Sequence, residues 1–202
     1  MVNILIRTSG RPIYFKRCIA SIHSQSYKDV RIIIANDSND FYCKEFDPIK
    51  VVREPMVEKY IDTARHFPFN DYLNHLLAHV KEGWVLLLDD DDELKHSYSL
   101  EHIMRKLNST NQVAFWRVDV AGILIPHTSN WMKRPVKKDI SGIGFCFHSK
   151  YIPLIHIAGW KQADYRLADQ LYSWCKPVWI NEILTATQNK LSAGNGERKD
   201  QQ

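Results

Sequence analysis

The sequence predicts an α/β fold with a mostly parallel sheet. Two observations carry this prediction: short apolar stretches that suit buried strands recur along the chain, and stretches with helical spacing separate them. A strand, a helix and a second strand in succession form a crossover that is nearly always parallel and right-handed. The length of 202 residues suits one domain with a sizeable core. We expect a single domain over residues 1–189 and a flexible polar tail over 190–202.

The first strand–helix–strand unit opens the chain. The largely apolar stretch from Val2 to Ile6 is typical of a buried strand, and the turn after it ends at Pro12, which suits the first position of a helix. A second buried strand, Val30 to Ala35, runs into the polar residues Asn36 to Asp40. One face of the intervening helix would carry Phe15, Cys18, Ile19 and Ile22.

The pattern recurs and then becomes less regular. A second helical stripe, which Gly83 could cap, precedes a buried strand from Trp84 to Leu88 that leads directly into Asp89 to Asp92. The stripe consists of Leu73, Leu76, Leu77 and Val80. Beyond it we expect a helix near 97–107, strands over 113–120, 143–147 and 178–184, and a short helix over 167–174.

Composition narrows the class of protein. The chain has 27 Lys and Arg and 23 Asp and Glu, and this scattered net charge of +4 is too mild for a nucleic-acid surface. The four cysteines lack the spacing of a zinc site and are expected to be reduced thiols. No window approaches the roughly 20 apolar residues of a membrane span, so we expect no integral membrane segment and a cytoplasmic protein.

Three predicted strands end in polar clusters, namely Thr8 to Arg11, Asn36 to Asp40 and Asp89 to Asp92. In open α/β sheets, ligands bind just beyond the carboxyl ends of the strands. We therefore expect the three clusters to converge on one crevice.

The acidic run is the most informative of these clusters. Two carboxylates about 4 Å apart repel each other by roughly 4 kcal/mol at an effective dielectric near 20, and a divalent cation removes that penalty. On an extended segment Asp89 and Asp91 would point one way and Asp90 and Asp92 the other, so that one pair could bind Mg²⁺ or Mn²⁺. The alternative is an Asp-rich turn whose last members cap the helix near 97–107.

Two further features stay open at this level. His148 follows a predicted strand and could be a ligand, although a solvated or core histidine is the commoner situation. The basic stretch from Asn130 to Lys138 is expected to be a loop, either a solvated connection or a flap in which Lys133 or Arg134 faces a diphosphate.

The N-terminal half resembles a known family. ILIRTSGRPIYFKRCIASIHSQSYKDVRIIIANDSND is similar to the opening of inverting family 2 glycosyltransferases, with its T-x-N-R-P and S-I-x-x-Q-(S/T)-Y segments, and GWVLLLDDDDEL resembles the segment that contains their DxD motif. The resemblance covers about the first 95 residues and is loose beyond Glu101. It implies a GT-A-like three-layer α/β/α fold with a mostly parallel, mixed central sheet, with 1–92 as the nucleotide-binding half and 93–189 as the acceptor half.

The resemblance also implies roles for individual residues. Thr8, Arg11, Asp37 and Asp90 match the nucleotide site, although turn chemistry alone is an alternative for the first three. Asp89, Asp91 and Asp92 match the positions that hold Mn²⁺ or Mg²⁺, and Asp169 matches the catalytic base, with Asp164 as the reserve candidate. The chain departs from the pattern at Gly10, Asn36 and Ala168, and only Ala64-Arg65-His66 represents the A-R-N-x-G segment.

The implied function is sugar transfer from a nucleotide sugar, with UDP as the expected nucleotide, to a hydroxyl of a glycan or other acceptor. The expected mechanism is a metal-assisted inverting displacement. Two other functions remain open, namely a nucleotide- or glycan-binding protein without turnover and a sugar-nucleotide nucleotidyltransferase.

Overall fold

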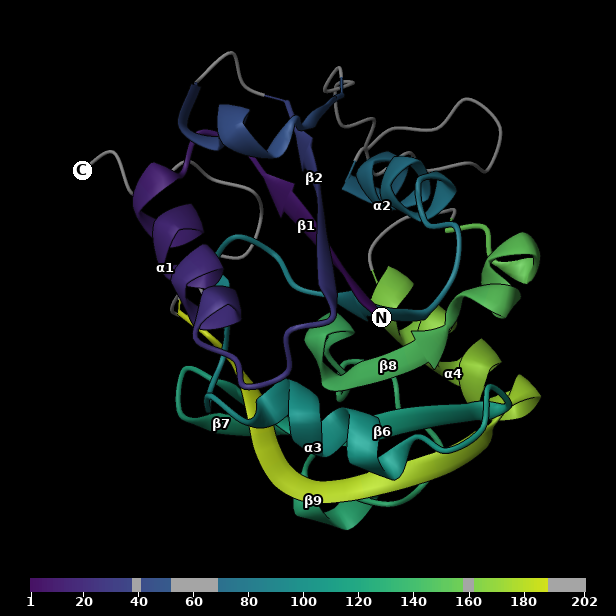
Figure 1. Cartoon of the computed structure of the whole chain (residues 1–202). Helices are drawn as coiled ribbons and strands as arrows, with labels where there is room; N and C mark the ends of the chain where they lie inside the picture. Colours follow the sequence, from purple (N-terminus) through teal and green to yellow (C-terminus); the bar gives the residue numbers. More distant parts are fainter. Residues whose placement is uncertain (38–40, 52–68, 158–161, 189–202) are drawn as a thin grey trace, which may run out of the picture.

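A single nine-stranded mixed sheet runs through the protein (Figure 1). The computed structural model describes residues 1–37, 41–51, 69–157 and 162–188. The main path of the sheet has the order β3-β2-β1-β4-β8-β6-β9-β5, and β7 pairs with β6 beside it. The strands are β1 (Val2–Thr8), β2 (Val30–Asn36), β3 (Ile49–Lys50), β4 (Trp84–Leu87), β5 (Asp92–Leu94), β6 (Gln112–Val120), β7 (Ile123–Ile125), β8 (Phe145–His148) and β9 (Lys176–Thr187).

Helices cover both faces of this sheet, which gives the three layers expected. The α-helices are α1 (Pro12–His23), α2 (Phe69–Ala78), α3 (Ser99–Lys106) and α4 (Ala163–Trp174). Short 3-10 segments are η1 (Phe41–Phe46), η2 (Thr128–Asn130), η3 (Gly142–Gly144) and η4 (Ser149–Leu154). In the core, α1 and α3 pack on one face of the sheet, and α2 and α4 pack on the other.

The central strands are buried on both faces because their side chains alternate between the two halves of the core. In β1, Ile4 and Ile6 belong to the α1 side, while Leu5 belongs to the α2 side. Strands β3, β2, β1 and β4 are mutually parallel, and β8 pairs with β4 in the antiparallel sense. The prediction of a mostly parallel, mixed sheet is therefore confirmed.

The predicted helices in the first half are present. Pro12 begins α1, and the four side chains of its predicted stripe are buried. In α2, the stripe of Leu73, Leu76 and Leu77 is buried, but the helix ends at Ala78, before Val80. Gly83 does not cap α2: its φ is +94°, and a Cβ there would lie 2.6 Å from the carbonyl oxygen of Met1. Glycine is required there because the backbone passes close to the start of β1.

The second half differs more from expectation. Helix α4 begins at Ala163 rather than near residue 167, and β9 extends over Lys176–Thr187 rather than 178–184. Its parallel pairing with β6 is interrupted by register shifts on either side of Arg117. The short strands β5 and β7 were not predicted.

Several expectations concern residues outside the described part of the chain. These are the 190–202 tail, Ala64-Arg65-His66, and Ser38 to Asp40 of the second polar cluster. One sheet passes through both proposed halves, 1–92 and 93–189, whose separate roles remain predictions. Among the described residues, no helix is long and apolar enough to cross a membrane. All four cysteines are buried and form no disulfide.

Candidate functional site

The ends of β1 and β4 bring the first and third polar clusters together. The two strands are parallel neighbours, and the pairing continues past β4 because the backbone N–H of Leu88 donates to Leu5 and that of Asp90 to Arg7, at 3.0 and 3.2 Å. The acidic run therefore lies beside the loop that follows β1, which is the convergence expected for two of the three clusters.

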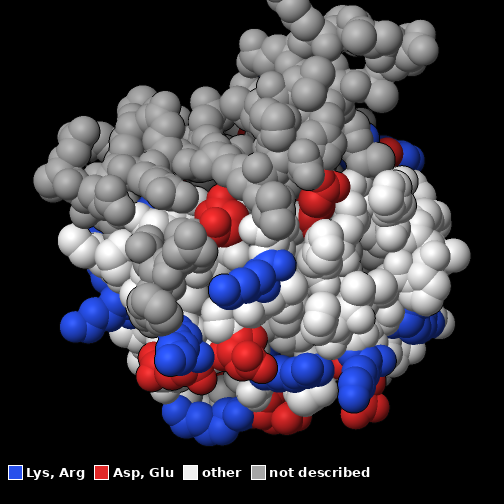
Figure 2. Space-filling model, turned by 90° about the horizontal axis from the view of Figure 1, so that it is seen from above, with Lys and Arg blue, Asp and Glu red and all other residues white. Residues whose placement is uncertain are grey.

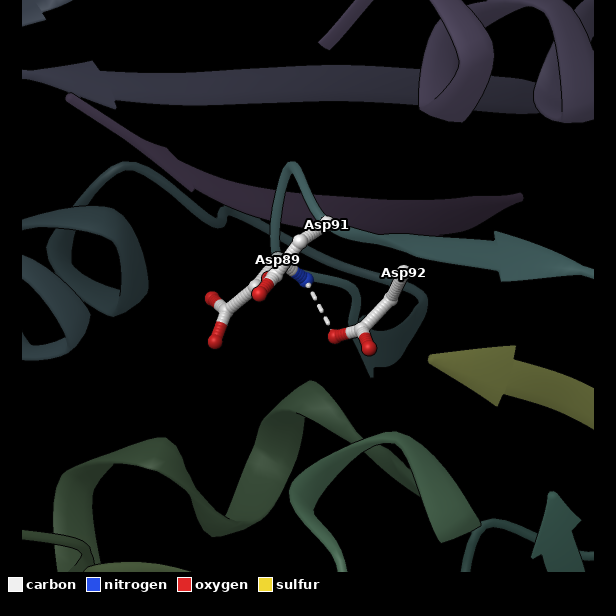
Figure 3. Close-up of side chains that lie close together, drawn as sticks. All are labelled: Asp89, Asp91 and Asp92. Carbon is white, nitrogen blue, oxygen red and sulfur yellow. Dashed lines mark hydrogen bonds between the residues drawn. The ribbon is translucent and has the colours of Figure 1, made fainter. Parts of the chain in front are cut away.

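The acidic run is a tight turn. The backbone N–H of Asp92 donates to the carbonyl of Asp89 at 3.0 Å, and the N–H of Asp89 donates to Oδ2 of Asp92 at 3.1 Å. The predicted alternation along an extended segment is therefore wrong, because the turn folds Asp92 back towards Asp89. Asp89, Asp91 and Asp92 each present one carboxylate oxygen, and these three oxygens lie within 4.8 Å of one another. Figure 3 shows the three side chains on the turn.

The turn does not cap a helix. Tyr98 occupies the N-cap position of α3, and Asp92 instead begins β5. Thr187, at the end of β9, donates to Oδ1 of Asp92 at 2.8 Å, so the last strand fixes this carboxylate. Burial raises the pKa of Asp92 well above its ordinary value, and the nearby charges of Asp91 and Asp89 raise it further.

Asp90 does not belong to the three aspartates whose oxygens gather, and it is completely buried. Its carboxylate accepts a hydrogen bond from Thr8 Oγ1 at 2.7 Å and two from the guanidinium of Arg11, one of them from Nε at 3.1 Å. Burial raises the pKa of Asp90 to about 7, against the opposing effect of the Arg11 charge. Asp90 thus ties the loop after β1 to the acidic turn.

Two arginines partly neutralise the turn. Arg11 also reaches Asp91, with 3.1 Å between NH1 and Oδ2. Arg7 forms a two-pronged ion pair with Asp89, in which Nε lies 2.7 Å from Oδ1. Tyr42 extends the same network, since its hydroxyl bonds Thr8 Oγ1 at 2.7 Å and accepts the N–H of Gly10 at 3.0 Å.

Asp37 lies at the end of β2, with one oxygen engaged and the other without a partner. Tyr72 of α2 donates to Oδ2 at 2.7 Å. The buried Oδ1 has no hydrogen-bond partner within the described part of the chain. A buried carboxylate oxygen that lacks a donor is costly, so a ligand N–H or a water is the expected partner.

The two candidate bases on α4 have different surroundings. Asp164 lies close enough to Arg7 and Asp89 for both charges to act on it, and its carboxylate accepts a hydrogen bond from the backbone of Gly142. Burial raises the pKa of Asp164 above its ordinary value, while Arg7 opposes this rise. Asp169 is bound by Arg134, with 2.6 Å between Nε and Oδ1.

Helix geometry separates these two carboxylates. Residues five apart on an α-helix point in directions that differ by roughly 140°. Asp164 and Asp169 therefore cannot face the same site, and the electrostatic contacts place Asp164 next to the acidic turn.

The basic stretch from Asn130 to Lys138 is fastened to the body of the protein. The side chain of Asn130 donates to Asp139 at 2.7 Å, and Arg134 bonds Asp169 and Ser173 of α4. Arg134 is thus occupied by α4 in this structure. His148 has a structural role: its Nδ1 accepts the backbone N–H of Lys150 at 3.2 Å, and its ring packs edge-on against Trp84.

Seen from above the view of Figure 1, the described surface carries both signs of charge (Figure 2). Lys and Arg side chains lie among Asp and Glu side chains over the described surface in this view.

Sequence reasoning singled out the acidic run, Thr8, Arg11 and Asp37 as site candidates, and their roles stay predictions; it missed several of the residues that hold them. Tyr42, Tyr72 and Thr187 each hold one of these side chains, and Arg7 pairs with Asp89. Only Arg7 stood beside a recognised cluster in the sequence. All four contacts join residues more than 30 positions apart in the chain, a separation for which the sequence shows no local signal.

Solved structures share this architecture. A crystal structure of residues 1–349 of S. aureus TarS matches 92% of this chain and 60% of its own, with a TM-score of 0.69 and 10% identity. Other structures of that protein are complexes with UDP and with UDP-GlcNAc. The mannosyltransferase PcManGT from Pyrobaculum calidifontis, in complex with GDP-Man and Mn²⁺, matches 96% of this chain and 58% of its own, with a TM-score of 0.65 and 13% identity. These similarities establish the GT-A-like fold.

Sequence comparison identifies the family. A curated relative, the GalNAc(5)-diNAcBac-PP-undecaprenol beta-1,3-glucosyltransferase of Campylobacter jejuni, is 29% identical over 114 residues, which are 53% of this chain and 34% of the relative. The chain thus matches about a third of that protein. The model of "Glycosyl transferase family 2" matches residues 4–132, a span that includes most of β1, the acidic turn and β6. The chain belongs to glycosyl transferase family 2.

Proposed function

We propose that the protein transfers a sugar from a nucleotide sugar, with UDP as the nucleotide, to a hydroxyl of a glycan or other acceptor, with inversion at the anomeric carbon. The observation that carries this proposal is the position of Asp164 beside the acidic turn at the end of β1 and β4. One carboxylate that can accept a proton then lies next to three that can hold a cation. Family membership and the nucleotide-sugar complexes of the structural relatives support the same reading.

The donor atoms of the turn fit a hard divalent cation. Asp89, Asp91 and Asp92 offer carboxylate oxygens, the ligands that Mg²⁺ and Mn²⁺ prefer, from a turn held by its own backbone. We expect these three residues to hold Mn²⁺ or Mg²⁺. When bound, the ion would stabilise the charge that develops on the departing diphosphate.

The nucleotide would lie along the ends of β1 and β2. The unpartnered Oδ1 of Asp37 can accept an N–H from the base, while Tyr72 holds the opposite oxygen. The loop after β1 is held by buried hydrogen bonds from Thr8 and Arg11 to Asp90. These three residues would contribute to nucleotide binding by fixing that loop in place.

The general base proposed from the structure is Asp164, in place of Asp169. A base must reach within about 3 Å of the acceptor hydroxyl, and a pKa nearer to neutral improves its efficiency. Burial raises the pKa of Asp164, whereas Arg134 neutralises the carboxylate of Asp169 on another side of α4. In a single displacement, Asp164 would take the acceptor proton as the acceptor oxygen attacks the anomeric carbon.

The test compares two substitutions of equal chemistry on one helix. Asp164→Asn should lower transfer by roughly 10²- to 10⁴-fold and leave UDP affinity unchanged, because an amide cannot accept the proton. Asp169→Asn should retain transfer within about threefold, because its partner Arg134 is exposed and solvated. Transfer would be measured with a donor and acceptor found by screening.

The opposite ranking of the two variants would assign the base to Asp169. A wild-type protein that binds UDP but turns over no donor in the presence of Mn²⁺ would favour a binding protein over an enzyme. A protein that forms a nucleotide sugar from a nucleoside triphosphate and a sugar phosphate would be a nucleotidyltransferase.

A further inference from the structure

Arg7 forms a two-pronged ion pair with one of the proposed cation ligands. Its Nε donates to Oδ1 of Asp89 at 2.7 Å, and its NH2 donates to Oδ2 of the same carboxylate. The Arg7 side chain is 22% exposed and that of Asp89 is 27% exposed, so the pair is largely shielded from water. Such fork-shaped pairs are among the stronger ion pairs in proteins.

Arg11, four residues further on, has a different role. It gives two of its hydrogen bonds to Asp90, which is fully buried and lies outside the trio of ligand candidates, and one to Asp91. Arg11 therefore mainly braces the loop after β1. Arg7, in contrast, contacts both oxygens of a carboxylate that a cation would use.

The net charge of the turn indicates how the Arg7–Asp89 ion pair affects cation binding. With all four aspartates ionised, the two arginines leave a net charge of −2, because four negative charges are offset by two positive ones. A divalent cation would neutralise that remainder. The guanidinium of Arg7 and the cation would, however, share Asp89, and two positive charges on one carboxylate repel each other.

We propose that Arg7 is an internal competitor of the divalent cation, which holds Asp89 in the cation-free protein and lowers the affinity of the acidic turn for the ion. The proposal rests on the proposed cation site but not on catalysis. It predicts that Arg7 stabilises the protein without a cation and is partly displaced from Asp89 when the cation binds. Asp164, the other carboxylate on which the charge of Arg7 acts, would then retain the guanidinium near the site.

The experiment measures Mn²⁺ binding by electron paramagnetic resonance, with neither nucleotide nor substrate present. Arg7→Gln should bind Mn²⁺ at least tenfold more tightly than the wild type, a change of about 1.4 kcal/mol. The same variant should unfold at a lower temperature in EDTA and be stabilised more by Mn²⁺ than the wild type, because Asp89 then loses its paired counter-charge. Arg7→Lys keeps the charge but not the fork, so its affinity should rise at least threefold.

Arg31→Gln is the matched control. Arg31 lies on β2, the strand next to β1, near the opposite end, and donates to the carbonyl of His79. This variant removes the same charge and should bind Mn²⁺ within twofold of the wild type. Arg7 variants with affinities within twofold of the wild type, or weaker, would overturn the proposal. If Arg7→Gln does not fold, Arg7→Lys alone decides. Loss of transfer in Asp164→Asn is independent of this result, so the two proposals fail separately.

Discussion

A substitution at Gly142 can test whether Asp164 is the general base, because it leaves the carboxylate of Asp164 itself intact. A Cβ placed on Gly142 would lie 3.0 Å from Oδ1 and 3.2 Å from Cγ of Asp164. Ordinary contacts of this kind begin near 3.4 Å, so the carboxylate must move by a few tenths of an ångström in Gly142→Ala. The backbone of Gly142 is not in the left-handed region, so alanine itself introduces no conformational strain there.

The expected effect follows from that displacement. A misplacement of about 1 Å can lower a rate by roughly 10²-fold, so a shift of less than half that size should lower transfer by about tenfold. The affinity for UDP should stay within twofold, because all the atoms nearest to a Cβ on Gly142 belong to Asp164. Steady-state kinetics would measure transfer, calorimetry would measure UDP binding, and thermal unfolding would check that the fold is retained.

One result would refute this reasoning directly. If Asp164→Asn abolishes transfer while Gly142→Ala turns over at the wild-type rate, the position of the carboxylate does not depend on its contact with Gly142. A loss of UDP affinity in Gly142→Ala would instead show that η3 shapes the nucleotide site.

Two further predictions follow from the contacts of the site, and a third concerns a buried hydrogen-bonded pair on β6 and β9. Asp91→Ala should weaken UDP binding in the presence of Mn²⁺ at least tenfold, about 1.4 kcal/mol. If calorimetry shows that the wild type binds UDP equally well in EDTA and in Mn²⁺, cation-assisted binding is contradicted. Asp37→Ala should weaken UDP binding without a loss of folded protein, whereas Tyr72→Phe should have a smaller effect. A ligand-bound structure in which the uracil ring lies away from Asp37 would reject this assignment. Thr185→Val should lower the free energy of unfolding by roughly 2–4 kcal/mol in urea titrations, because it leaves the buried indole N–H of Trp116 and a backbone carbonyl without a partner; a change below about 0.5 kcal/mol would contradict it.

The sequence predicted those parts of the fold that have a local pattern. The α1 stripe and strands β1, β2 and β4 stand out because their apolar spacing matches a helix or a doubly buried strand. Strands β5 and β7 have three residues each and form because longer strands, β9 and β6, lie beside them. No periodicity in three residues can indicate such pairing.

The geometry of the acidic run was predictable in kind but not in detail. Four aspartates after a buried strand indicated a cation site, and three of their carboxylates do gather. The assumption of an extended segment placed Asp90 and Asp92 together, whereas the turn brings Asp92 to Asp89 and leaves Asp90 to Thr8 and Arg11. The turn depends on a backbone hydrogen bond and on β9, which reaches Asp92 from the far end of the chain.

The starting point of α4 explains why the sequence favoured Asp169 over Asp164 as the candidate base. With a helix expected from residue 167, Asp164 belonged to the preceding loop and Asp169 to the first turn of the helix. In the structure α4 begins at Ala163, so Asp164 is in the first turn and Asp169 lies in the middle of the helix. The positive end of a helix stabilises a carboxylate in its first turn. Together with Arg7, this opposes the rise in pKa that burial causes at Asp164. A carboxylate under these opposing influences can be ionised near neutral pH and still accept a proton, as a general base requires.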